Sequence, residues 1–101
     1  MSRTSADYKH GLLEDLADPA EAAAYLNAAL DEGSQEAFLL ALRDVAEAHG
    51  MSEVARRADL NRESMYRMLS RRGNPRFSSL AVLLEELGLK LTVEIKAHAH
   101  A

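Results

Sequence analysis

The sequence predicts an all-α domain, a helix-turn-helix bundle of about five helices followed by one C-terminal β-strand. Apolar residues recur every three to four positions through most of residues 18–88, and this period changes to two over residues 89–96. The chain has 101 residues, enough for one domain with one core. We divide it into an N-terminal extension at 1–17, a helical domain at 18–88 with the helix-turn-helix motif at 51–71, the strand at 89–96, and a flexible tail at 97–101.

The N-terminal extension is predicted to be loosely held at 1–10 and anchored to the body by Leu12, Leu13 and Leu16. The first helix of the domain starts at Asp18-Pro19, because Asp is a favoured N-cap and Pro suits the first helical position. It should run to about Glu32 and stop at Gly33. Its inner face comprises Ala22, Ala23, Leu26, Ala29 and Leu30.

A second helix is expected from about Gln35 to His49, with Ser34 as its N-cap and Gly50 as its terminator. Its apolar residues repeat with the helical period. The inward-facing set is Phe38, Leu42, Val45 and Ala46.

Residues 51–71 are the most informative part of the sequence, because they predict two short helices that meet at a tight turn. Ser52 is the expected cap of the first helix, which should end near Ala58, and Asn61 is the expected cap of the second. The inward-facing side chains are Val54, Ala55, Ala58, Met65, Met68 and Leu69. This pattern leaves Arg62, Glu63, Ser64, Tyr66, Arg67 and Arg71 facing solvent or a DNA groove.

The charge distribution supports a nucleic-acid surface at this motif, although the whole chain has a net charge of −4. Residues 1–50 carry three Lys or Arg and ten Asp or Glu, whereas residues 51–76 carry seven Arg and three acids. Local positive charge sets the attraction to phosphate. We assign phosphate contacts to Ser52, Tyr66, Arg71, Arg72, Asn74 and Arg76.

The last helix is predicted to start at Ser78 and to end at Gly88, with Phe77 packed in the core and Leu80, Leu83, Leu84 and Leu87 on its inner face. In the following segment Leu89, Leu91, Val93 and Ile95 alternate with polar residues, which is typical of a half-buried strand. A lone strand needs a partner. The N-terminal segment of the same chain is one candidate, and the same strand of a second copy is the other. The second option gives a homodimer that uses Leu91, Val93 and Ile95 and places two reading helices on successive turns of DNA.

The stretch from about Tyr8 to Ile95 resembles the addiction-module antidote proteins, HigA-like antitoxins with a lambda-repressor-type helix-turn-helix domain. The resemblance covers nearly nine tenths of the chain in the family's order. It is carried by Asp18-Pro19, Ala23-Ala24-Tyr25-Leu26-Asn27-Ala28-Ala29-Leu30, Phe38-Leu39-Leu40-Ala41-Leu42-Arg43-Asp44-Val45-Ala46, Asn61-Arg62-Glu63-Ser64-Met65-Tyr66-Arg67, Gly73-Asn74-Pro75-Arg76-Phe77-Ser78-Ser79-Leu80 and Leu87-Gly88-Leu89-Lys90-Leu91.

The resemblance implies an antitoxin of a type II toxin–antitoxin module. Such a protein neutralises a small basic toxin similar to the RelE, ParE and HigB group, and it represses its own operon by binding double-stranded operator DNA. The base-reading positions that the wider helix-turn-helix family implies are Asn61, Arg62, Glu63, Ser64 and Arg67. The sequence departs from the family where the turn has Asp59 in place of the usual Gly, although Asp tolerates a left-handed backbone better than most residues.

The acidic N-terminal half suits a basic protein partner. We expect the toxin to contact the surface between about Tyr8 and Glu36, including Asp15, Asp18, Glu21, Asp31 and Glu32. The alternative is a solvated acidic face that only keeps the protein soluble.

Enzymatic functions find little support in the sequence. It contains no Cys and lacks metal-binding clusters and phosphate-binding glycine loops, so we expect no cofactor, no metal and no catalytic residues. His98 and His100 in the tail could hold a metal only weakly. The absence of Cys fits a cytoplasmic protein, and no apolar run is long enough to span a membrane. Two other functions stay open: a protein-interaction module that uses the helix-turn-helix as a scaffold, and a stand-alone repressor without a toxin.

Overall fold

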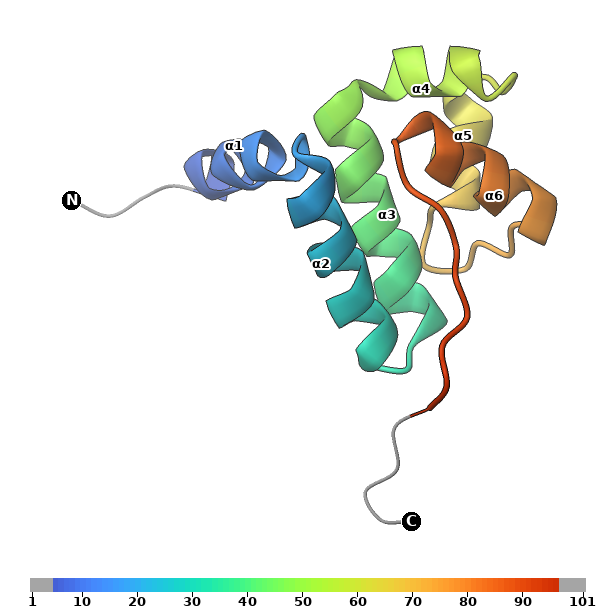
Figure 1. The fold of residues 1–101 in the computed structure, drawn as a ribbon. Helices are drawn as coiled ribbons and strands as arrows, with labels where there is room; N and C mark the ends of the chain where they lie inside the picture. The colour runs from blue at the N-terminus through green and yellow to red at the C-terminus, as the bar shows by residue number, and fades with distance from the viewer. Residues whose placement is uncertain (1–4, 97–101) are drawn as a thin grey trace.

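The computed structural model describes residues 5–96, and within them it contains six helices and no β-strand (Figure 1). The all-α prediction is confirmed for these residues, with one helix more than expected. The helices are α1 (Ser5–Leu16), α2 (Pro19–Asp31), α3 (Gln35–His49), α4 (Met51–Arg57), α5 (Arg62–Met68) and α6 (Phe77–Glu86). The predicted tail at 97–101, with His98 and His100, lies outside the described residues.

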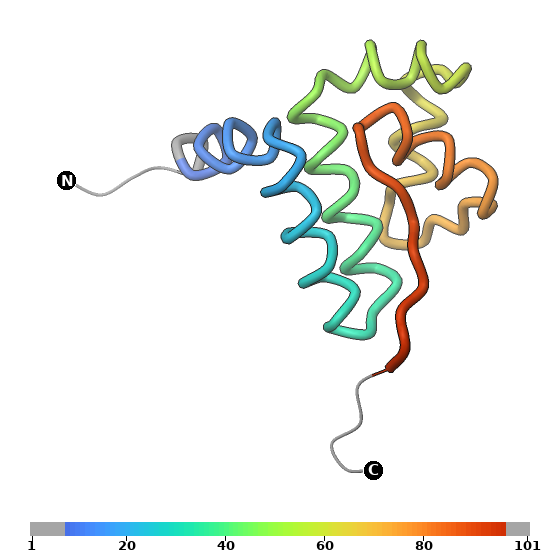
Figure 2. Tube along the Cα trace, in the orientation of Figure 1, coloured from blue at the N-terminus to red at the C-terminus, as the bar shows by residue number. Residues whose placement is uncertain are grey.

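Helices α2 and α3 form a hairpin whose two helices lie side by side (Figures 1 and 2). Both begin at the predicted caps. The carboxylate of Asp18 accepts a hydrogen bond from the Ala20 N–H at 3.3 Å, and the Ser34 hydroxyl accepts one from the Ala37 N–H at 3.1 Å. These caps satisfy backbone donors that a helix start leaves without an internal partner. The tertiary structure therefore keeps both helices where the sequence predicts them.

The N-terminal extension is a helix, α1, which the sequence did not predict. Leu16 is buried and Leu12 packs against the core, so the predicted leucine anchor is confirmed. The ammonium group of Lys9 also forms a salt bridge of 3.3 Å with Glu47 of α3. Helical propensity alone gives little signal here, because Gly11 lowers the propensity in the middle of the segment and a short helix depends on packing.

The core takes side chains from all six helices: α3 packs against α1, α2 and α4, and α4 packs against α5 and α6. Its fully buried side chains are Leu39, Leu42, Val45, Met65, Leu69, Leu83 and Leu87, and no polar or charged residue is buried in the described part of the chain. Leu30 was expected on the inner face of α2, but half of its surface is exposed. It lies in the last turn of α2, close to the exposed end of the hairpin.

Helix α4 starts two residues earlier than the predicted Ser52 cap implies, and α6 starts one residue earlier than predicted. Gly50 precedes α4 and no side chain caps it, so the predicted Ser52 cap is wrong and Ser52 is exposed in the first turn. The earlier start places Met51 in the core. Phe77 begins α6 and is 72% exposed, so its predicted core position is also wrong. Burial increases along α6 towards Leu83 and Leu84, because the first turn extends past the core.

The C-terminal segment at 89–96 does not form the predicted β-strand. It runs as an extended chain away from α6, and residues 90–96 are all exposed (Figure 2). The N-terminal segment, one of the two predicted partners, is folded into α1 on the other side of the α2–α3 hairpin (Figure 1). The segment has no neighbouring strand among residues 5–96, so it has no backbone ladder to complete.

No helix in residues 5–96 combines the length and the apolar character needed to cross a membrane.

Candidate nucleic-acid interface

The turn between α4 and α5 is built around Asp59, whose φ of 60° lies in the left-handed region. The Leu60 N–H donates to the Ala55 carbonyl at 2.8 Å and closes the turn. Asp is one of the few residues other than Gly that adopts this conformation readily. The prediction that Asp59 preserves the tight turn is therefore confirmed.

Helix α5 packs one face against the core and exposes charged side chains on its opposite face. Met65 and the following Leu69 are fully buried, whereas Arg62, Glu63 and Arg67 are exposed. Asn61 caps the helix, with its side-chain oxygen 2.6 Å from the Ser64 backbone nitrogen that donates to it. The oxygen of Asn61 is thus already engaged, and its amide nitrogen is the polar group left for another contact.

Residues from α5 and from the following loop line one shallow, open groove. It brings together four predicted DNA-contacting side chains, Ser64 and Arg67 of α5 with Arg72 and Asn74 of the loop. The other lining residues are Leu60, Met68, Ser70, Gly73 and Pro75. Two residues predicted to contact base edges and two predicted to contact phosphates therefore line the same groove.

The loop at 70–76 is held in place by the start of α3. The Gln35 side-chain amide donates to the Gly73 carbonyl at 3.0 Å, and Arg71 forms a salt bridge of 2.7 Å with Glu36. A Cβ at Gly73 would lie 2.0 Å from the Met68 carbonyl oxygen, so only glycine fits. The sequence reasoning missed Gln35, Glu36 and the need for Gly73, because these contacts join residues far apart in sequence.

Tyr66 of α5 is half-buried and lies near two guanidinium groups. The Cζ of Arg43 is 4.9 Å from the ring centroid, and that of Arg62 is 5.6 Å from it, both within the range of a cation–π contact. Arg43 is held in turn by Glu47, at 3.2 Å. Arg43 thus belongs to the surroundings of α5, although nothing in its local sequence predicted this.

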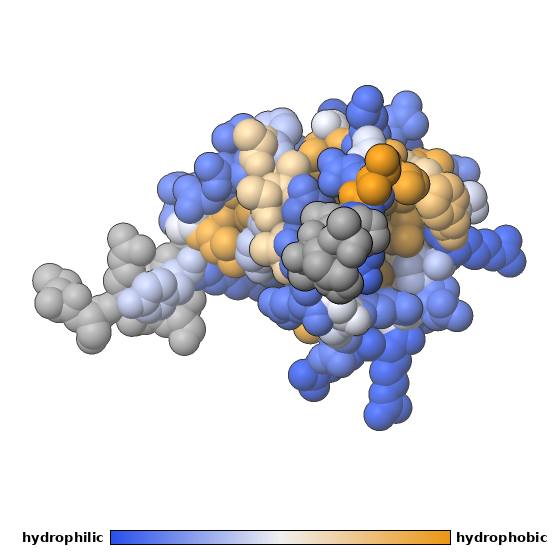
Figure 3. All heavy atoms as spheres, turned by 60° about the horizontal axis from the view of Figure 1, so that its bottom comes forward, coloured by the Kyte–Doolittle hydropathy of each residue, from blue (hydrophilic) through white to orange (hydrophobic). Residues whose placement is uncertain are grey.

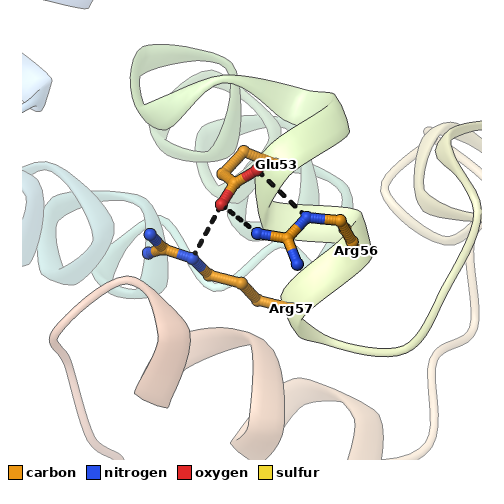
Figure 4. Close-up of polar contacts among 3 residues, drawn as sticks. All are labelled: Glu53, Arg56 and Arg57. Atoms are coloured by element: carbon orange, nitrogen blue, oxygen red, sulfur yellow. Dashed lines mark hydrogen bonds and ion pairs between the residues drawn. The ribbon is translucent and has the colours of Figure 1, made fainter.

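Glu53 offsets the charge of two arginines on α4, Arg56 and Arg57 (Figure 4). The Nε atoms of Arg56 and Arg57 lie 3.2 and 3.1 Å from its carboxylate oxygens. The hydrogen bond from Arg56 is the main reason that the pKa of Glu53 is lowered. These two arginines therefore contribute less positive charge to the surface than their number suggests.

Four other arginines of the basic block form no salt bridge with any residue in the 5–96 range: Arg62, Arg67, Arg72 and Arg76. All four are exposed, and they lie on α5 and the loop that follows it. Exposed guanidinium groups suit bidentate contacts with phosphate or guanine. The available positive charge is concentrated at α5 and its loop.

The predicted toxin-facing carboxylates do not form one patch. Asp15, Asp18 and Glu21 surround the junction of α1 and α2, whereas Asp31 and Glu32 lie at the other end of α2, roughly 18 Å away along the helix axis. All five are exposed. The acidic half of the chain therefore offers two separate negative surfaces.

The chain matches the family described as "probable addiction module antidote protein" over residues 8–95. It is 40% identical to an uncharacterised protein of Haemophilus influenzae over 81 residues, which cover 80% of this chain and 84% of the relative. No solved structure matches the chain. The protein belongs to the probable addiction-module antidote family.

Proposed function

We propose that this family member is the antitoxin of a type II toxin–antitoxin module and represses its own operon as a DNA-binding protein. Helices α4 and α5 act as a helix-turn-helix of the lambda-repressor type, and α5 enters the major groove of operator DNA. The observation that carries the proposal is the surface of α5. A left-handed turn at Asp59 precedes it, Met65 fixes it to the core, and Arg62 and Arg67 are exposed.

Each predicted residue then has a defined role. Arg62 and Arg67 read base edges together with Asn61, Glu63 and Ser64. The phosphate contacts come from Ser52, Tyr66, Arg71, Arg72, Asn74 and Arg76. Arg71 exchanges its salt bridge with Glu36 for a phosphate, whereas Arg72 and Arg76 need break no salt bridge with residues 5–96. A homodimer doubles this surface on a palindromic operator.

The acidic surfaces of α1 and α2 receive a small basic toxin similar to the RelE, ParE and HigB group. Complementary charge accelerates the encounter and favours basic partners over acidic ones. The exposed carboxylates at both ends of α2 support this part of the proposal.

The test is an anisotropy titration with the DNA upstream of this protein's own gene at two salt concentrations. Arg62→Ala and Arg67→Ala should each lower affinity for that DNA by about 1–3 kcal/mol, or roughly 10- to 100-fold, with little effect on unrelated DNA. Arg72→Ala should weaken binding to every sequence and flatten the salt dependence. Lys9→Ala removes a positive charge on α1, which packs against α2 and α3, and serves as the control.

Equal, weak binding of wild type and Arg62→Ala to all DNA would overturn the reading role of α5. The helix pair would then act as a scaffold for toxin binding, and toxin capture would become the function to test.

A further inference from the structure

We propose that residues 88–96 of two copies of this chain pair as an antiparallel ribbon whose two-fold axis passes through Thr92. The ribbon supplies the neighbour that the extended segment lacks within residues 5–96. The inference names the surface through which the homodimer of the proposed function forms, and it is tested separately, because association can be measured without DNA or toxin.

The segment has a free backbone edge and a free apolar face. Leu89 is its last residue with a recorded backbone hydrogen bond, which its N–H donates to the Leu84 carbonyl at 2.8 Å. Val93 is 99% exposed and Ile95 is 95% exposed. An unpaired strand edge that carries exposed apolar side chains favours pairing with another chain.

The helical domain has an apolar hollow beside this segment. A hollow of about 140 Å³ lies between α2, α6 and the segment, and Leu26, Leu30, Leu84, Leu89 and Leu91 are among its lining residues. Figure 3 views the molecule from this end and shows apolar atoms exposed among hydrophilic ones. A second strand carrying Val93 and Ile95 would cover this hollow and the exposed side of Leu30.

Charge selects a second copy as the occupant and fixes the register. With Thr92 opposite Thr92, each Lys90 faces the Glu94 of the other copy, so the ribbon contains two opposite-charge pairs. The same register sets Leu91 opposite Val93 and Leu89 opposite Ile95, all on one face. A sequence that satisfies its own reversed copy in this way suits an isologous interface.

Neighbouring registers are less favourable. A shift of one residue sets Thr92 opposite Val93 and mixes polar and apolar residues on each face. A shift of two residues in one direction sets Lys90 opposite Lys96, and in the other direction it leaves Lys90 and Glu94 without charged partners. The register centred on Thr92 therefore combines the charge pairs with a continuous apolar face.

Sedimentation velocity on the full chain at micromolar concentration and low salt tests the charge pairs. Wild type should dimerise. Lys90→Glu and Glu94→Lys each turn two attractive pairs into two repulsive ones, so each should raise the dimer dissociation constant roughly tenfold or more. The double variant Lys90→Glu/Glu94→Lys restores opposite charges and should restore the wild-type constant. Circular dichroism of every variant should be unchanged, because both side chains are exposed.

A cysteine crosslink tests the register independently, because the chain contains no Cys. Thr92→Cys places two thiols opposite each other at the axis, with Cα atoms roughly 4.5–5.5 Å apart, and should form a disulfide-linked dimer on mild oxidation. Glu94→Cys is the matched control. Its two copies would lie four residues apart along the ribbon, roughly 14 Å, and should not crosslink.

Four results would overturn the inference. One is a strict monomer at micromolar concentration, and another is a dimer indifferent to both charge reversals. The third is failure of the double variant to recover dimerisation. The fourth is crosslinking through Glu94→Cys in place of Thr92→Cys. Rescue by the double variant together with crosslinking at Thr92→Cys would establish the ribbon.

Discussion

The basic and acidic halves of this protein show how differently a fold can distribute charge. Arg67 of α5 and Arg72 of the following loop are brought to one groove, which Ser64 and Asn74 also line. The five predicted toxin-facing carboxylates of the acidic half lie in two groups near opposite ends of α2. The acidic half has the larger net charge, yet only in the basic half do predicted site residues gather in one groove.

Tertiary contacts explain the difference. Helix α5 is held by buried Met65, and its loop is held by Gln35 and Glu36 of α3. The carboxylates instead extend from the ends of a single helix, and Asp18 is engaged only as a helix cap. A charged segment becomes a defined site where the core and long-range contacts fix its side chains. The following predictions test this comparison.

The largest expected effect comes from Met65, which links α5 to the core. Met65→Ala should destabilise the protein by about 2–5 kcal/mol, because it removes a fully buried side chain and leaves a cavity. Leu26→Ala in α2 should have a cost in the same range. Urea denaturation measures the loss of stability in both variants. Titration of each folded variant with operator DNA then measures whether DNA binding is also weakened. If the comparison is right, Met65→Ala alone weakens DNA binding.

Charge reversal at the two ends of α2 should separate the two acidic surfaces. We expect Asp31→Lys/Glu32→Lys to slow association with the basic toxin by about tenfold at low salt. Asp15→Lys/Glu21→Lys should have a smaller effect, because the ammonium group of Lys9 already adds positive charge to α1. Stopped-flow association measures both rates. Equal reductions in the association rate would show that the toxin responds to the net charge and not to one acidic surface. No reduction would show that the acidic surfaces do not contact the toxin.

Glu53→Gln should sharpen the basic surface by releasing Arg56 and Arg57 from their salt bridges. We expect affinity for all DNA to rise a few-fold and the salt dependence to steepen by about one unit. DNA titration at several salt concentrations measures the affinity and its salt dependence. Glu85→Gln, at an exposed position of α6, is the control. An unchanged slope would show that α4 does not approach the DNA backbone.

The smallest expected effect concerns Tyr25, which joins α2 to α3 within the acidic half through a 2.7 Å hydrogen bond that its hydroxyl donates to Asp44. Burial, with a further contribution from this hydrogen bond, raises the pKa of Tyr25 to about 12. The folded state therefore holds the proton more tightly than the unfolded state, and the resulting stability is complete below about pH 10 and is lost as the pH rises towards 12. Tyr25→Phe should cost about 1 kcal/mol at pH 8 and should flatten the alkaline fall in thermal stability. An equally steep fall in the variant would assign the effect to another group.

The local features of the fold could be predicted from the sequence because they depend on neighbouring residues. Asp18, Ser34 and Asn61 cap the helices that they were expected to cap, and Asp59 adopts the left-handed turn. The apolar stripe of α3 is buried as its spacing predicts, and in the predicted α5 stripe Met65 and Leu69 are buried whereas Met68 is half-buried. Each of these features is settled within about one helical turn of the chain.

Several features of the candidate site could not be predicted, because they depend on distant residues. Arg43 lies over Tyr66, and Glu36 holds Arg71, across 23 and 35 positions of the chain. Exposure of Phe77 depends on how far the first turn of α6 extends past the core. None of these relationships leaves a periodic or local signal in the sequence.

By itself, the sequence determined where four of the six helices lie to within one residue of their starts, which faces are apolar, and where positive charge accumulates. Periodicity, capping and composition act over short distances and can be read directly. Only the tertiary structure decided that Arg67 and Arg72 share one groove, whereas the predicted toxin-facing carboxylates lie in two groups. It also decided that residues 5–16 form a helix and that the 89–96 segment has no neighbouring strand among residues 5–96. These outcomes depend on which elements pack together, and packing is a property of the whole chain.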